Sequence, residues 1–193
     1  MGFTYETGDD FSTGNRFLDQ PGEYHMVVAE VSEKPRKGNG ELIPNAAFGV
    51  KLKVLAGSVA GQEDREMDVS FFNPKSDSKD GGAMAKKKID RMLLATNLID
   101  PDDKGKKLEI DLNKMVNRQI LVKCDEEEGT KRKFVSISFA NIFHVDDPEA
   151  ASYPRDVEAI RMIPTSLRRI KGQSMKAQEP KVSEAPKKDF SAI

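Results

Sequence analysis

The sequence predicts a mainly β domain of five strands and one helix, followed by a tail. Five segments alternate apolar and polar residues, which is the period of a half-buried strand. One segment between the third and fourth of them repeats apolar residues at helical spacing. Gly, Pro, Asn and Asp gather between the segments, as turns require. A chain of 193 residues is long enough for one well-packed core.

Each strand is expected to bury one face. The five strands are expected at residues 22–35, 48–55, 65–72, 119–127 and 131–145. Their core faces carry apolar, β-branched or aromatic side chains, which strands favour. These core-facing residues are Tyr24, Met26 and Val28; Phe48, Val50, Leu52 and Val54; Met67, Val69 and Phe71; Ile120, Val122 and Cys124; and Val135, Ile137 and Phe139.

The helix is expected at residues 84–99, where Ala85, Ile89 and Leu93 share one stripe. Asp80 is placed to cap its start or lie near the cap. The sequence Asp100-Pro101 ends it, because a residue before proline avoids the helical conformation. Residues 108–119 are expected to form a short helical turn or an extended connection.

The order of three strands, one helix and two strands is that of the OB-fold, a five-stranded Greek-key barrel. Closing a barrel removes exposed sheet edges, which suits short strands. A generic five-stranded α+β sheet has the same order and remains an alternative. We expect a loosely packed lead-in over residues 1–20, the OB domain over 21–145, and a C-terminal tail over 146–193. This tail is expected to hold one marginal helix followed by a flexible, disordered stretch.

Composition excludes several classes of protein. With 31 basic and 32 acidic residues, the chain is not polybasic, although a local basic stripe remains compatible with this balance. Cys124 is the single cysteine, so no intramolecular disulfide forms, which fits a reducing cytosol. No apolar run approaches the roughly 20 residues of a membrane span, and no signal peptide is visible. We therefore expect a cytoplasmic protein without membrane association.

The sequence contains few residues or motifs that are typical of catalytic sites, so we do not expect an enzyme. His25 and His144 are far apart in sequence, and together with one cysteine they give no metal-ligand spacing. Glycine-rich phosphate loops and nucleophile motifs are missing. The acidic runs at 100–103 and 125–128 fall in or beside predicted loops and are expected to be solvated charge. No cofactor is expected.

Basic residues do fall where an OB barrel binds polynucleotides, namely its second and third strands and two flanking loops. The candidate nucleic-acid-binding residues are Arg36, Lys37, Lys51, Lys53, Phe72, Lys131, Arg132 and Lys133. The cations would pair with phosphates, and Phe72 would stack on a base for about 1–3 kcal/mol. The alternative is an ordinary surface, because Glu66 and Asp68 are expected on the same face and cross-strand ion pairs could neutralise the lysines.

The arrangement of these segments resembles a family of small phage proteins from recombination and replication modules. The match covers residues 21–145 and includes Gly22-Glu23-Tyr24, the turn 57–61 (Gly57-Ser58-Val59-Ala60-Gly61) and Asn73. The chain departs from the family at Gln62, where an arginine close to the second glycine is usual, and at its end, where many members are strongly acidic. The resemblance implies an OB-fold that binds single-stranded DNA.

The function expected from these observations is sequence-tolerant, non-catalytic binding of single-stranded DNA in phage DNA replication or recombination. Cooperative binding would favour self-association into a homo-oligomer. Replication or recombination proteins are possible partners of the tail, where Asp189 and Phe190 could act as a docking peptide. An OB-fold adaptor or inhibitor of a host enzyme is the alternative, because one fold supports many functions. A second alternative function is that of a nuclease accessory protein that binds a metal ion at residues 100–103.

Overall fold

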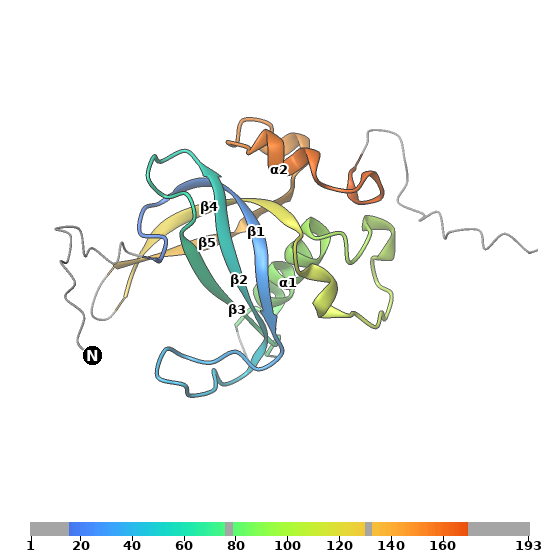
Figure 1. The fold of residues 1–193 in the computed structure, drawn as a ribbon. Helices are drawn as coiled ribbons and strands as arrows, with labels where there is room; N and C mark the ends of the chain where they lie inside the picture. The colour runs from blue at the N-terminus through green and yellow to red at the C-terminus, as the bar shows by residue number, and fades with distance from the viewer. Residues whose placement is uncertain (1–15, 76–78, 130–132, 170–193) are drawn as a thin grey trace, which may run out of the picture.

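The described residues form a five-stranded antiparallel sheet in the order β3-β2-β1-β4-β5, with β1 at its centre (Figure 1). The computed structural model describes residues 16–75, 79–129 and 133–169. The strands are β1 (Gly22–Ser32), β2 (Ala46–Gly57), β3 (Glu66–Phe72), β4 (Gln119–Glu128) and β5 (Lys133–His144). The helices are α1 (Ala83–Ala95), between β3 and β4, and the short α2 (Val157–Arg161), after β5. The mainly β class predicted from the sequence is confirmed.

The main core lies on the face of the sheet that the alternation of each strand predicted. Tyr24, Met26, Leu52 and Ile120 are fully buried there, and Cys124 lies among them. Phe48 and Phe71 stack across β2 and β3, with ring centroids 4.7 Å apart. The side chain of Phe139 lies outside the described part of the chain.

Tyr24 of β1 and Gly57 of β2 pack closely together. A Cβ atom at Gly57 would lie 2.6 Å from the ring of Tyr24, so only glycine lets β2 pass this ring. The Tyr24 hydroxyl donates a hydrogen bond to the Gln20 carbonyl at 2.8 Å. Gln62, at the position of departure, is buried, and its side-chain oxygen accepts a hydrogen bond from the Asp19 amide. Tyr24 and Gln62 are therefore buried parts of the fold.

The two edge strands face each other across a cavity. Residues from β3 and β5 line it together, although the described residues show no hydrogen-bonded ladder between these strands. Residues 16–18 lie along β3 instead, since the Leu18 amide donates to the Glu66 carbonyl and the Glu66 amide donates to the Arg16 carbonyl. α1 contacts both β5 and β3. Leu18 is buried, so the described end of the expected lead-in belongs to the fold.

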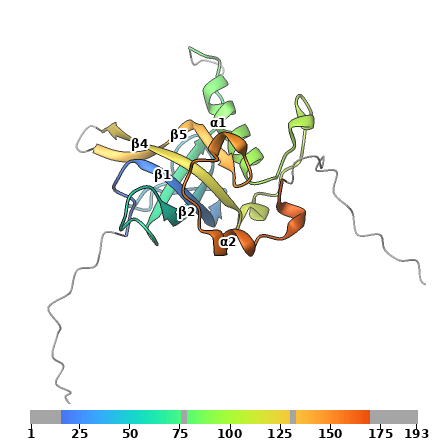
Figure 2. The ribbon, with the colours of Figure 1, turned by 90° about the horizontal axis from the view of Figure 1, so that it is seen from above.

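Residues 146–169 pack against the sheet, which differs from the boundary expected at residue 145. In Figure 2 this orange segment runs across β4. It covers the outer face of the sheet, where His25, Leu121 and Phe143 are neighbours on three adjacent strands. Burying the large apolar side chains on that face away from water is favourable, and Tyr153 and Ile163 pack over them. Residues 170–193, where we expected disorder, lie outside the described residues.

A polar network fastens this C-terminal segment to α1. The guanidinium of Arg168 donates to both carboxylate oxygens of Asp146, and the Arg169 amide donates to the same carboxylate. Arg169 also donates to the side-chain oxygen of Asn97 at 3.0 Å, and Asn97 donates to the Leu167 carbonyl at 2.7 Å. Burial alone would raise the pKa of Asp146, but these hydrogen bonds lower it below its ordinary value.

Candidate nucleic-acid interface

The loop between β1 and β2 folds back onto the outer face of β2. The Ile43 amide donates to the Pro35 carbonyl at 3.0 Å, which closes the base of the loop. Pro35 lies directly on Gly49 of β2, because a Cβ atom at Gly49 would be 2.7 Å from the Cβ of Pro35. The absence of a side chain at Gly49 therefore allows the close approach of this loop.

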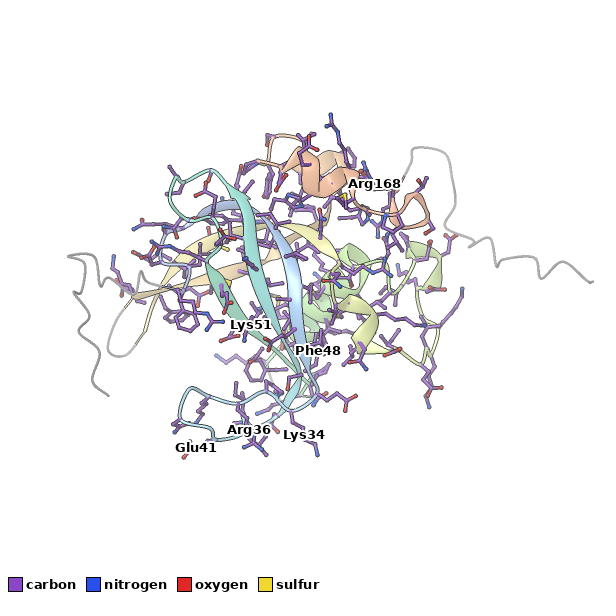
Figure 3. All side chains as sticks on the ribbon, viewed as in Figure 1. Lys34, Arg36, Glu41, Phe48, Lys51 and Arg168 are labelled. Carbon is purple, nitrogen blue, oxygen red and sulfur yellow. The ribbon has the colours of Figure 1, made fainter. Side chains whose placement is uncertain are left out.

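A groove of about 550 Å³ lies between this loop and the outer faces of β2 and β3. We call it the loop groove. Its cations are Lys34, Arg36, Lys37 and Lys51, and its carboxylates are Glu30 and Asp68. Figure 3 shows Lys34 and Arg36 on the loop and Lys51 near the middle of the sheet. The groove thus combines a basic loop with two neighbouring strands.

Two of the four cations in the loop groove have no carboxylate partner among the described residues, namely Lys34 and Arg36. Arg36 donates to the Gly40 carbonyl at 2.7 Å, a bond within the loop. Lys37 is paired with Glu41 at 3.3 Å, and Lys51 is paired with Glu30 at 3.2 Å. Exposed pairs of this kind contribute about 0–1 kcal/mol, so a phosphate can compete with these carboxylates.

The other candidate residues do not join the loop groove. Lys53 is paired with Asp64 at 2.8 Å and lies outside it. Lys133 is paired with Glu126 at 2.6 Å and lines the acidic cavity between β3 and β5. Phe72 is 46% exposed and lies on the outer face of β3, two residues beyond the groove residue Ser70. The structure therefore brings together Arg36, Lys37 and Lys51 and separates Lys53 and Lys133 from them.

Lys131 and Arg132 lie outside the described residues. Lys34 was not among the binding residues predicted from the sequence, because it falls at the expected end of the first strand. Only the return of the chain at Pro35 places it beside the groove. The expectation that Glu66 and Asp68 share a face with the two lysines is confirmed, and the strand register places Asp68 beside Lys51 and Glu66 beside Lys53. The ion pairs that form are nevertheless with Glu30 and Asp64.

The acidic run at 100–103 has structural partners. The Asp100 carboxylate accepts from the Asp102 amide and caps the short 3₁₀ helix Pro101–Asp103. Asp103 accepts from the Asp100 amide and from the ammonium group of Lys106. Across residues 16–75, 79–129 and 133–169, no group of three or more His, Cys, Asp or Glu side chains is placed to hold a metal ion.

The histidines and the cysteine are buried in the fold. Burial lowers the pKa of His25 and of His144 to about 4, so both rings are neutral at neutral pH. The Nδ1 atom of His25 accepts a hydrogen bond from the Asp156 amide, and that of His144 accepts from the Asp146 amide. Burial raises the pKa of Cys124 to about 12, which keeps its thiol protonated and poorly nucleophilic.

Comparison with known proteins gives no family for this chain: no family model matches it, and no curated protein is significantly similar. None of the helices in the described residues has the length and apolar character that crossing a membrane demands.

Proposed function

We propose that this protein binds single-stranded DNA in the loop groove, without catalysis and with tolerance for sequence. The observation that carries the proposal is a groove on the outer faces of β2 and β3 in which Lys34 and Arg36 have no carboxylate partner among the described residues. Cations in a groove can follow a phosphate backbone irrespective of base sequence. The exposed ring of Phe72 on the same face offers a surface on which a base can stack.

We further propose that the sheet is a partly open OB barrel. The order β3-β2-β1-β4-β5 contains every strand neighbour of such a barrel except the pair of β3 with β5. Both edge strands line one cavity, as expected where a barrel is incompletely closed. In an OB barrel, the loop groove would occupy the usual position of polynucleotide binding. A role in phage DNA replication or recombination is supported by the resemblance carried by Gly22, Tyr24 and the 57–61 turn.

The test is a fluorescence anisotropy titration with labelled oligo-dT of about 16 nucleotides at two salt concentrations. We expect saturable binding that is preferred over duplex DNA. If four cations contact phosphates, the logarithm of affinity should fall with the logarithm of salt with a slope of about −3. Lack of saturable binding would overturn the proposal and favour the protein-interaction alternative.

Variants locate the binding surface. The double substitution Lys34→Gln and Arg36→Gln should weaken binding about 5- to 10-fold. The matched control is Lys86→Gln with Lys87→Gln, which removes the same charge from exposed positions on α1. Equal losses in both double variants would show that net charge, and not the loop groove, determines binding.

A further inference from the structure

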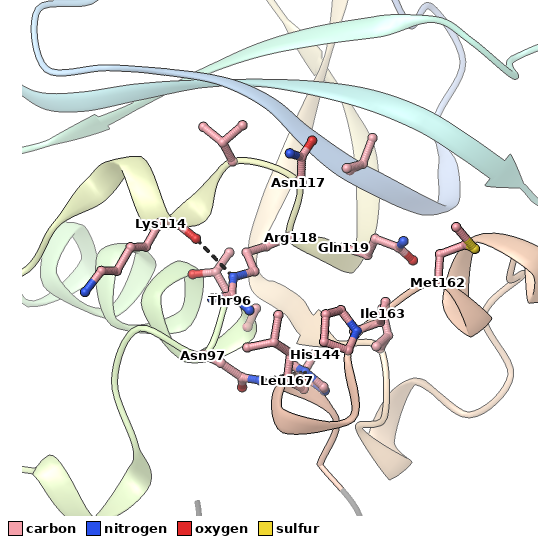
Figure 4. Close-up of a pocket in the computed structure, with 15 residues that line it drawn as sticks. Thr96, Asn97, Lys114, Asn117, Arg118, Gln119, His144, Met162, Ile163 and Leu167 are labelled. Atoms are coloured by element: carbon pink, nitrogen blue, oxygen red, sulfur yellow. Dashed lines mark hydrogen bonds between the residues drawn. The ribbon is translucent and has the colours of Figure 1, made fainter. Parts of the chain in front are cut away.

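A second cavity, of about 490 Å³, lies between the start of β4, the end of α1 and residues 162–167 (Figure 4). We call it the Arg118 cavity. Met162, on its wall, is 83% exposed although it is a large apolar residue. The apolar residues that line the cavity are Val27, Ala95, Val116, Val145, Met162, Ile163, Pro164 and Leu167. The volume lies within the range of small-molecule sites.

The polar lining of this cavity is positively charged. Its cations are Lys114 and Arg118, and none of its lining residues is Asp or Glu. Within the described residues, neither cation forms an ion pair. The Nη1 atom of Arg118 is buried and has no hydrogen-bond partner there. Burial lowers the pKa of Arg118, and no neighbouring carboxylate offsets this effect.

The position of Arg118 is fixed by the backbone around it. Its Nε atom donates to the Lys114 carbonyl at 3.0 Å, shown by the dashed line in Figure 4. The Arg118 carbonyl accepts from the Val28 amide, and the Asn117 amide donates to the Val28 carbonyl. The backbone at Arg118 is therefore fixed to the central strand, and the guanidinium is fixed to the turn at Lys114, before any ligand binds, which reduces the entropy lost on binding.

A partly buried guanidinium without a counter-charge is unfavourable, and proteins usually pair such groups. The planar guanidinium matches the two oxygens of a carboxylate or phosphate with parallel hydrogen bonds. An oxyanion beside the guanidinium would supply the missing charge. The apolar wall would at the same time cover the non-polar part of the same molecule.

We propose that the Arg118 cavity binds a small organic anion, in which a carboxylate or phosphate is attached to an apolar or aromatic body. Arg118 contacts the oxyanion, Lys114 adds positive charge nearby, and the body lies against Met162 and Ile163. The proposal is independent of DNA binding, because the Arg118 cavity and the loop groove share no lining residue.

The test is a nuclear magnetic resonance titration of the full chain with phenyl phosphate, benzoate, inorganic phosphate and benzyl alcohol. We expect saturable amide shifts at residues 114–119 and 162–167 with phenyl phosphate, with benzoate or with both. Binding of one compound alone would identify the oxyanion, and the relative affinities would rank the two if both bind. Inorganic phosphate, which lacks the body, and benzyl alcohol, which lacks the charge, should bind at least about 5-fold more weakly.

Arg118→Gln should weaken binding about 10-fold or more, and the exposed Lys114→Gln should weaken it about 2- to 3-fold. Lys123→Gln, which removes an exposed cation of β4 outside the cavity, should bind as the parent chain does. If the Arg118→Gln variant does not fold, comparing the ligand affinities of Lys114→Gln and Lys123→Gln still tests whether the anion binds in the Arg118 cavity. The proposal is overturned by the absence of saturable shifts up to about 10 mM, by equal binding of benzyl alcohol, or by unchanged binding in Lys114→Gln and Arg118→Gln.

Discussion

Lys51 lies in the loop groove with its charge already compensated by Glu30. A phosphate that binds Lys51 must displace this carboxylate and also approach its negative charge. Glu30→Gln removes both obstacles and leaves Lys51 in place. We expect this substitution to strengthen oligo-dT binding about 2- to 5-fold, which corresponds to the free energy of an exposed ion pair. Anisotropy titration at low salt measures the change.

Glu126→Gln is the matched control for this prediction. It frees Lys133 in the same way, but Lys133 lines the cavity between β3 and β5 and lies outside the loop groove. The affinity of the Glu126→Gln variant for oligo-dT should equal that of the parent chain. A gain in Glu126→Gln as large as that in Glu30→Gln would instead indicate a general effect of net charge.

The β1–β2 loop approaches β2 closely at the contact between Pro35 and Gly49. A methyl group at Gly49 would overlap the Pro35 ring, which cannot rotate away. Gly49→Ala should therefore displace the loop, weaken oligo-dT binding and lower the free energy of unfolding by about 1–3 kcal/mol. Urea unfolding and anisotropy measure the two effects.

Gly38→Ala is the control within the same loop, because a Cβ atom at Gly38 has no atom within 4 Å. It should leave both quantities close to those of the parent chain. Normal DNA binding in a folded Gly49→Ala variant would contradict the role given to the loop. This contact was not predicted from the sequence, where Gly49 is only one position of the alternating second strand.

The C-terminal segment makes the whole molecule sensitive to acid, because it seals His25 and His144 within the fold. The folded-state pKa of each ring is about 4, below the ordinary value of 6.5. The unfolded chain therefore binds more protons than the folded chain between these values. Stability is complete above about pH 6.5 and falls as the pH decreases towards 4, by up to about 3 kcal/mol for each histidine.

Urea unfolding at pH 7, 6 and 5 measures this dependence. Carboxylate groups such as Asp146, whose pKa is lowered, titrate below this range. His25→Gln should flatten the slope by about 1.4 kcal/mol per pH unit, the value for one proton. A free energy of unfolding that does not change between pH 7 and pH 5 would contradict the burial of both rings.

Much of the fold could be predicted because each strand repeats a local pattern. The alternation of Tyr24, Met26 and Val28 depends only on neighbours along the chain, and so does the stripe that predicts α1. The Asp80 side chain near the start of α1 was predicted for the same reason, and it accepts hydrogen bonds from the amides of Gly82 and Met84.

The features that were not predicted depend on contacts between residues far apart in the sequence. Tyr153 and Ile163 do not belong to a periodic apolar pattern. They pack over the outer face of the sheet because β1, β4 and β5 bring His25, Leu121 and Phe143 side by side there. The carboxylate beside each lysine likewise depends on which segments meet, since Lys51 and Glu30 are 21 positions apart. Local periodicity determines which face of an element is apolar, whereas charge pairing and cavities depend on distances that exist only after the chain has folded.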